Sequence, residues 1–138
     1  MAKKTKTEVK FNYGESIRRL RQTGPQRLYL IWGPEDYLAE QYLAELRRLC
    51  VGDEADDFSY RKLNERDFSA ISLAEAIDSV PFLSERSMVE VRGVDLNKLS
   101  ETDEVIKAIS DIPDYCTVAF LCEPNFEPDK RLKLYKTF

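Results

Sequence analysis

A short acidic segment holds the densest group of side chains in the sequence that could do chemistry. Its carboxylates belong to Asp53, Glu54, Asp56 and Asp57, with Lys62 nearby. Clustered carboxylates bind hard metal ions such as Mg²⁺, so one interpretation is a metal-dependent phosphotransferase. The segment lacks the spacing and the glycine of an EF-hand loop, which favours the simpler alternative of a solvated acidic loop.

Several other kinds of catalysis are excluded by composition, because the 138 residues include no histidine. A Ser-His or Cys-His pair is therefore impossible, as is a metal site with a histidine ligand. The three cysteines are Cys50, Cys116 and Cys122, and no Cys-x-x-Cys motif occurs among them. This odd, scattered set predicts reduced, buried thiols rather than a disulfide framework.

The turn after an apolar segment at residues 28–32 is the second place to look for a ligand. Ligands in open α/β sheets bind at the carboxyl ends of strands, and Gly33 stands at that point. A phosphate-binding loop that starts at Gly33 would need glycine at Leu38, lysine at Ala39 and a hydroxyl at Glu40. None of these requirements is met, so the phosphate-binding chemistry is missing.

The residues that do follow argue against a bound phosphate. In the turn Gly33-Pro34-Glu35-Asp36, two carboxylates stand where a helix is expected to begin. Carboxylates at that position satisfy the positive end of the helix dipole and repel a phosphate group. We therefore expect a degenerate phosphate-loop position at Gly33, Pro34, Glu35 and Asp36, with no bound cofactor, no metal and no catalytic residue of its own.

Alternating apolar segments and helical patterns organise the rest of the chain. This alternation predicts an α/β fold in which a parallel sheet is covered by helices on both faces. The expected strands are 28–32, 58–63, 87–91 and 116–122, and the expected helices are 16–22, 37–50, 72–80, 102–112 and 129–138. Residues 15–138 form one domain in this interpretation, and residues 1–14 a flexible arm.

The arm and its neighbourhood carry most of the positive charge. Residues 1–27 contain eight lysines and arginines against two glutamates, a net charge of +6, and the whole chain has −4, which leaves −10 for residues 28–138. A basic arm of this kind suggests a nucleic-acid binder as a further alternative, against the simpler view of a solvated tail.

Two large apolar residues, Phe82 and Leu83, fall in a short connection between a helix and a strand. The helical pattern before them places Val80 on the same apolar face as Leu73 and Ile77, and Pro81 ends the helix. Phe82 and Leu83 either fold back into the core or provide an anchor for the pocket of a partner protein.

Neither end of the chain, nor any segment between, has the features of a membrane protein. No apolar run approaches the roughly 18 residues of a membrane span. The first six residues are charged and lack the apolar stretch of a signal peptide. We therefore expect a cytoplasmic protein without a membrane partner.

Three stretches resemble the bacterial DNA polymerase III delta subunit family. They are Tyr-Leu-Ile-Trp-Gly-Pro-Glu-Asp-Tyr-Leu at 29–38, Pro-Phe-Leu-Ser-Glu-Arg followed by an apolar strand at 81–91, and Asp-Lys-Arg-Leu-Lys-Leu-Tyr-Lys at 129–136. The resemblance implies an AAA+-like first domain, related to P-loop NTPases, that has lost nucleotide binding. It also implies a noncatalytic subunit of a DNA polymerase holoenzyme, a nucleotidyltransferase complex in which the delta subunit binds and helps open the β sliding clamp for loading on primed DNA.

The same resemblance implies partners and site residues. The partners are the β clamp and, for the full-length protein, the gamma/tau and delta-prime clamp-loader subunits. The clamp contact corresponds to Pro81 and Phe82, with Leu83 adjacent; proline replaces the leucine of the well-studied form, so either Pro81 or Leu83 is the second anchor. Family members are longer, so a fifth strand, a lid domain and a collar domain are expected to follow Phe138.

Overall fold

Apolar segments of the sequence become the strands of a five-stranded parallel sheet, in the order β1-β2-β5-β4-β3. The computed structural model describes residues 8–10, 13–33, 36–52, 59–81 and 85–138. The strands are β1 (Glu8–Lys10), β2 (Leu28–Trp32), β3 (Tyr60–Leu63), β4 (Ser87–Arg92) and β5 (Cys116–Leu121). Every residue of β2 and β5 is buried, as expected for strands covered on both faces.

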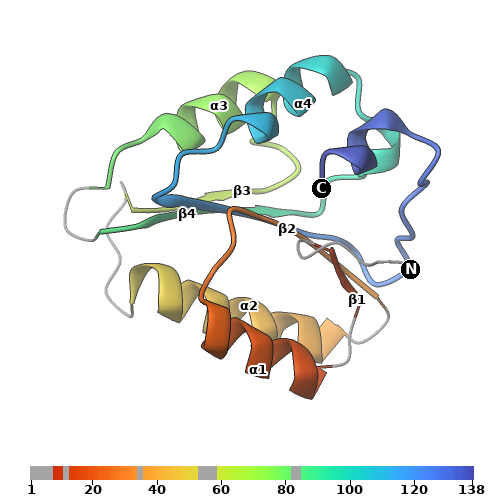
Figure 1. The fold of residues 1–138 in the computed structure, drawn as a ribbon. Helices are drawn as coiled ribbons and strands as arrows, with labels where there is room; N and C mark the ends of the chain where they lie inside the picture. The colour runs from red at the N-terminus through yellow and green to blue at the C-terminus, as the bar shows by residue number, and fades with distance from the viewer. Residues whose placement is uncertain (1–7, 11–12, 34–35, 53–58, 82–84) are drawn as a thin grey trace.

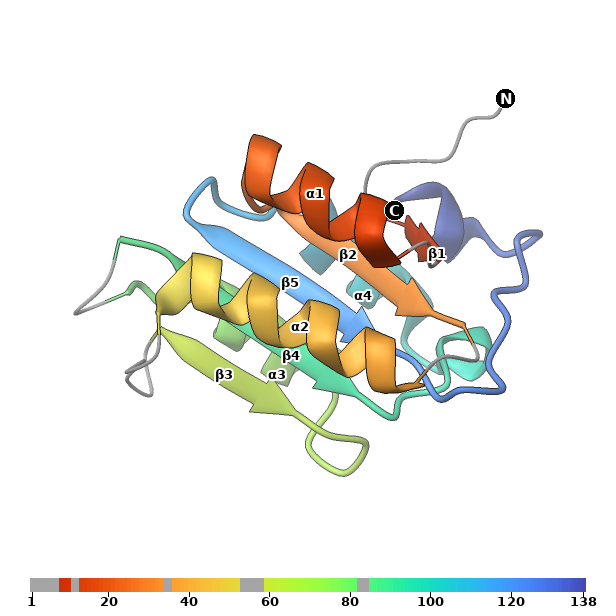
Figure 2. The same ribbon diagram turned by 90° about the horizontal axis from the view of Figure 1, so that it is seen from below.

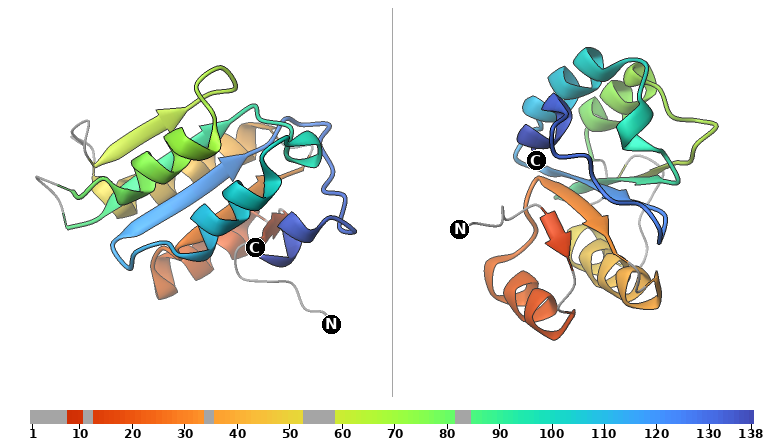
Figure 3. Two further views of the ribbon diagram at one scale, coloured as in Figure 1. Left: turned by 90° about the horizontal axis from the view of Figure 1, so that it is seen from above. Right: turned by 90° about the vertical axis from the view of Figure 1, so that its right-hand side faces the viewer.

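Helices cover both faces of the sheet and give the three layers that the sequence predicts (Figure 1). One face is covered by α1 (Tyr13–Thr23) and α2 (Asp36–Val51), and the other by α3 (Ala70–Asp78) and α4 (Thr102–Ser110). Figure 2 shows α1 and α2 lying over one face of the sheet and running roughly along the strands, and Figure 3 shows α3 and α4 on the opposite face. Short 3-10 helices lie at Leu96–Lys98 (η1) and Lys133–Lys136 (η2).

The alternation of side chains along the strands divides the core into two clusters. On β4, Val89 and Val91 face α3 and α4, whereas Met88 faces α1 and α2. The central strand β5 pairs with β2 on one side and with β4 on the other. Ala119 and Leu121 of β5 belong to the second cluster and face α1 and α2. Because side chains alternate along a strand, Thr117 lies on the same side.

For the described residues of the expected flexible arm, 8–10 and 13–14, strand β1 and the start of α1 correct that expectation. Glu8, Val9 and Lys10 pair in parallel with the end of β2, and helix α1 begins at Tyr13 rather than near Ser16. This pairing supplies backbone partners to one edge of a buried apolar strand. The sheet therefore has a fifth strand, but that strand comes from the amino-terminal side of the domain.

Two expected helices differ in the structure from their predicted ranges. Helix α3 ends at Asp78, and Ser79 takes an extended conformation, so Val80 leaves the apolar helix face and its side chain is 67% exposed. The helix expected over 129–138 is reduced to η2, which follows Leu132 in an extended conformation. Its apolar residue Leu134 still packs in the core beside α4, so the amphipathic pattern correctly predicts burial but not helix length.

Candidate functional site

The turn after β2 lies at the carboxyl ends of the strands, where open α/β sheets bind ligands. Gly33 is buried and has a φ of 140°, a left-handed value that favours glycine. Helix α2 begins at Asp36, so one of the two expected carboxylate-bearing residues does stand at the helix start. Pro34 and Glu35 lie outside the described residues, and only the backbone of Asp36 is described.

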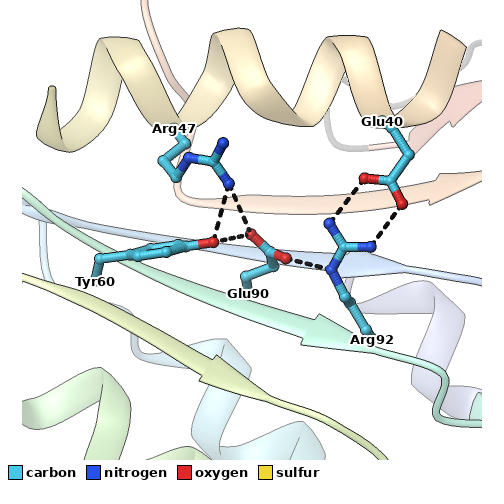
Figure 4. A network of polar contacts seen from close by, with 5 residues as sticks. All are labelled: Glu40, Arg47, Tyr60, Glu90 and Arg92. Carbon is cyan, nitrogen blue, oxygen red and sulfur yellow. Dashed lines mark hydrogen bonds and ion pairs between the residues drawn. The ribbon is translucent and has the colours of Figure 1, made fainter. Parts of the chain in front are cut away.

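Glu40, at the position where a phosphate-binding loop has its hydroxyl, forms a two-pronged ion pair with Arg92 at the end of β4 (Figure 4). Arg92 donates from Nη1 to Glu40 Oε2 at 2.6 Å and from Nη2 to Glu40 Oε1 at 2.8 Å. The Arg92 guanidinium lowers the pKa of the Glu40 carboxyl below its ordinary value. The same bonds raise the pKa of Arg92, so both groups are charged near neutral pH.

Behind this pair lies Glu90, a fully buried carboxylate on β4. It accepts hydrogen bonds from the Nε of Arg92 and from the Tyr60 hydroxyl, and it lies 3.8 Å from Nη1 of Arg47. Arg47 also donates to the Tyr60 oxygen at 3.1 Å, and its guanidinium lies 5.4 Å from the centre of the Tyr60 ring. Burial, together with the bond to Glu90, raises the pKa of Tyr60 to about 12.

These five side chains form a network that connects α2, β3 and β4 (Figure 4). A buried carboxylate is tolerated when cations and donors surround it, as they do around Glu90. The charges are thereby balanced from within the molecule. The Glu40 carboxylate, which already pairs with Arg92, would repel a phosphate that approached this arginine. The arrangement therefore disfavours phosphate binding at this place.

One local feature of the sequence indicates this network. Glu90 interrupts the apolar strand Met88-Val89-Glu90-Val91, and a buried charge calls for a partner. Arg92 follows at i+2, on the same side of the strand. The two partners from α2, Glu40 and Arg47, could not be found in this way, because their approach depends on how the helix packs on the sheet.

The other expected site begins where α3 ends, at the amino-terminal ends of the strands. Pro81 is half-buried there and follows the exposed Val80. Phe82 and Leu83 lie outside the described residues. The structure therefore places the end of α3, which leads into Pro81, and the Gly33 turn at opposite ends of the parallel strands, since α3 runs antiparallel to them (Figure 1).

The expected acidic cluster of Asp53, Glu54, Asp56 and Asp57 also lies outside the described residues. Lys62 is exposed on the edge strand β3. Within the described ranges, no group of three or more histidine, cysteine, aspartate and glutamate residues is arranged to hold a metal ion. The described residues also include no helix long and apolar enough to cross a membrane.

The sequence matches the family of the DNA polymerase III delta subunit over residues 29–138. Among curated protein sequences, none matches this chain. The matched range contains all three stretches on which the resemblance rests, including the segment from Pro81 to Val91.

Two solved structures have a similar fold. The DNA clamp loader delta protein of Bacillus subtilis is 20% identical with a TM-score of 0.78, over 91% of this chain and 39% of that protein. A DNA polymerase III gamma subunit-related protein of Thermotoga maritima is 13% identical with a TM-score of 0.59, over 85% of this chain and 47% of that protein. The chain thus spans about two fifths of the delta protein that it matches.

Proposed function

Because this chain belongs to the DNA polymerase III delta subunit family, we propose that it binds the β sliding clamp and helps open it for loading on primed DNA. The observation that carries the proposal is the family match, which extends over residues 29–138 and includes the expected clamp-contact segment. The similar fold of a bacterial protein described as a clamp loader delta protein supports it. The corresponding place of action is the bacterial cytoplasm.

In this proposal Phe82 is the main anchor of the clamp contact, and Pro81 or Leu83 is the second. Support comes from the end of α3, where the exposed side chain of Val80 and the half-buried Pro81 lead into this segment. An aromatic side chain that enters a pocket of a partner commonly contributes about 2 kcal/mol or more to binding. The other partners proposed for the full-length protein are the gamma/tau and delta-prime subunits and, through the complex, primed DNA.

No nucleotide chemistry is part of this role. The ion pair of Glu40 with Arg92 lies beside the degenerate turn at Gly33, and Leu38 and Ala39 replace the glycine and lysine of a phosphate-binding loop. The proposed contribution of this domain is therefore a binding surface, and ATP-dependent work falls to other subunits of the loader.

The test is the affinity for the cognate β clamp, immobilised for surface plasmon resonance, of the wild-type chain and of Phe82→Ala. We expect Phe82→Ala to bind about thirtyfold more weakly, which corresponds to about 2 kcal/mol. Its melting temperature should stay within a few degrees, because an anchor for a partner is not part of the core.

Pro81→Ala and Leu83→Ala, measured in parallel, identify the second anchor by the larger loss of affinity. Ile71→Ala is the matched control, because Ile71 is 70% exposed on α3 but stands at the other end of that helix. If Phe82→Ala unfolds the domain, Phe82 is a core residue. If it binds as tightly as the wild type, the anchor assignment is wrong.

A further inference from the structure

The outer surfaces of the two helix layers carry opposite charge. Among the described side chains of α1 and α2, the exposed charged residues are four arginines and one glutamate, a net charge of +3: Arg18, Arg19, Arg21, Arg48 and Glu15. On α3 and α4 they are four carboxylates and one lysine, a net charge of −3: Glu75, Asp78, Asp103, Glu104 and Lys107. The whole chain has a net charge of −4, so the positive surface is a local exception to its composition.

Two of the four arginines are held in place by one carboxylate between the helices. Glu45 on α2 accepts from Nε of Arg21 on α1 at 3.1 Å, and from Nε and Nη2 of Arg48 at 3.2 and 2.7 Å. The Glu45 side chain is 14% exposed, whereas those of Arg21 and Arg48 are 61% and 53% exposed. The two guanidinium groups therefore cover the carboxylate and present their own charge to the solvent.

The other two arginines, Arg18 and Arg19, are exposed on α1. Neither forms an ion pair among the described residues. A cation in the last turn of a helix is stabilised by the helix dipole, which accounts for Arg21 and Arg48. Arg18 and Arg19 stand before the last turn of α1, so the dipole does not account for them.

The remaining surface around these arginines is neutral and contains little apolar area. The exposed residues nearby on the two helices are small or polar: Gln22, Thr23, Gln41 and Ala44. The large aliphatic side chains of the same helices are buried: Ile17, Leu20, Leu43 and Leu46. Among the described residues of α1 and α2, the one large hydrophobic residue that is exposed is Tyr37, at the opposite end of α2 from Arg48.

This composition distinguishes among the partners that a positive surface could have. A protein interface has an apolar core, and a helix that binds a membrane surface inserts apolar side chains, whereas the described surface around the arginines offers neither. Single-stranded nucleic acid is bound by stacking on several aromatic side chains. Duplex DNA needs cations and neutral donors that reach its phosphate oxygens, and the forked guanidinium of arginine suits phosphate well.

We propose that the arginine face, formed by Arg18, Arg19, Arg21 and Arg48, binds the phosphate backbone of duplex DNA without reading its sequence. This contact uses other residues than the clamp contact and does not rest on the proposed clamp binding. The negative charge on α3 and α4 repels DNA from the other side of the sheet. The charge distribution therefore turns α1 and α2 towards the duplex as the two molecules approach.

The test is the affinity of the whole chain for a short, fluorescently labelled DNA duplex, measured by anisotropy between about 50 and 200 mM NaCl. If all four arginines meet phosphates, the logarithm of the association constant should fall with the logarithm of the salt concentration with a slope of about −3.6. Arg18→Gln/Arg19→Gln should reduce the slope to about −1.8 and weaken binding about tenfold or more at about 50 mM salt. Arg18→Lys/Arg19→Lys keeps the charge and should bind within about threefold of the wild type.

Two controls separate the arginine face from the overall charge and from the basic arm. Lys98→Gln/Lys107→Gln removes the same charge from exposed positions on η1 and α4, and should bind like the wild type. Lys3→Gln/Lys4→Gln/Lys6→Gln tests the arm that the sequence suggests as a nucleic-acid binder. Circular dichroism should give Arg18→Gln/Arg19→Gln the melting temperature of the wild type, because neither arginine is buried or in an ion pair among the described residues.

Each outcome supports or overturns the arginine face. The expected slopes, with binding retained in both controls, support it. It is overturned if the wild type does not bind the duplex at about 50 mM salt, or if the Lys98/Lys107 variant loses as much affinity as the Arg18/Arg19 variant. A loss confined to the arm variant assigns the DNA contact to the arm, and tighter binding to a single strand of the same sequence contradicts the choice of duplex DNA.

A second copy of this chain is the competing partner, since its α3 and α4 surface is negative. Sedimentation velocity at low salt measures this association. If Arg18→Gln/Arg19→Gln abolishes self-association while no form of the chain binds DNA, the arginine face is a contact between copies and the proposal is wrong. None of these results affects the clamp contact, which Phe82→Ala tests separately.

Discussion

Charge is balanced differently at the two ends of the parallel strands, which we call the carboxyl edge, where the strands end, and the amino edge, where they begin. At the carboxyl edge of the strands, Glu40, Arg92 and Glu90 satisfy one another, and this is the edge where α/β proteins usually bind ligands. At the amino edge, Arg86 donates to a neutral hydroxyl, and the exposed Val80 and half-buried Pro81 lie nearby in the sequence. One edge is closed by its own charges, while the described residues of the other include an exposed apolar side chain, Val80.

This difference shows which end of the strands is satisfied from within the molecule. The Glu40 carboxylate on α2 pairs directly with the Arg92 guanidinium on β4, and this contact holds α2 on the sheet without an external charge. The proposed partner contact begins at Pro81, which follows α3 at the other end of the strands.

The largest effect is expected at the carboxyl edge, from Arg92→Met. The substitution leaves the buried carboxylate of Glu90 with Tyr60 and Arg47 as its polar partners, so the free energy of unfolding should fall by about 3 kcal/mol. Urea denaturation measures this change, and Arg66→Met should stay within about 0.5 kcal/mol of the wild type. Clamp affinity of the folded variant should be unchanged; a parallel loss of affinity would show that the two edges are coupled.

Glu40→Ala should have a smaller effect at the same edge. The Glu40 side chain is 42% exposed, so solvent screens its pair with Arg92, and the expected loss of stability is about 1 kcal/mol. Neither the wild type nor the variant should bind ATP with Mg²⁺ in titration calorimetry, since Leu38 and Ala39 provide no phosphate-binding groups. Micromolar binding by the wild type would contradict the view that this edge is closed.

Glu45, which lies away from both edges, is expected to make a smaller contribution, a dependence of the stability on pH. Arg48 first, and Arg21 second, lower the pKa of its carboxyl to about 2 from an ordinary value of 4.5. Because the pKa is lower in the folded state, the stabilisation is complete above about pH 4.5 and is lost as the pH falls towards about 2. Melting temperatures between pH 6 and 3 should therefore fall less for Glu45→Gln than for the wild type, and equal slopes would refute the assignment.

The smallest expected signal compares thiols at the two edges. Cys116 begins β5 at the amino edge, and Cys122 follows its carboxyl end; both are buried and free. Burial raises the pKa of Cys116 to about 11 and that of Cys122 to about 12, so neither is a thiolate at pH 8. Both should react slowly with a thiol reagent in the folded protein, and faster labelling of one would identify the edge that opens first.

Much of the fold could be predicted because its signals are local. Continuous apolar segments marked β2 and β5, and apolar periodicity marked α2 and α4, within a few residues of their ends. The sequence also shows that the residues of a phosphate loop are absent after Gly33, because that loop requires particular residue types at fixed spacing; the degenerate phosphate-loop position itself stays a prediction. The family resemblance, confirmed by the match over 29–138, rested on three such stretches.

What the sequence did not predict depends on contacts between distant segments. Strand β1 is short and polar, and it forms because β2 offers an edge, which no local pattern reveals. Val80 is an exception with a local cause: it fits the helical stripe, but the adjacent Pro81 disfavours its helical conformation, and its side chain is exposed. The bond from Arg86 to Thr117 joins residues 31 apart in the sequence, and only the assembled sheet brings them together.

The central place of β5 also determines when this domain can fold. Leu28 pairs with Val118, so these two central strands join positions 90 residues apart in the sequence. Closing so long a loop is entropically costly, which slows folding relative to proteins with local contacts. During synthesis, β2 and β4 would wait with one edge each unpaired until residues 116–121 leave the ribosome, and this is the interval in which the nascent chain is most exposed to aggregation and most in need of a chaperone.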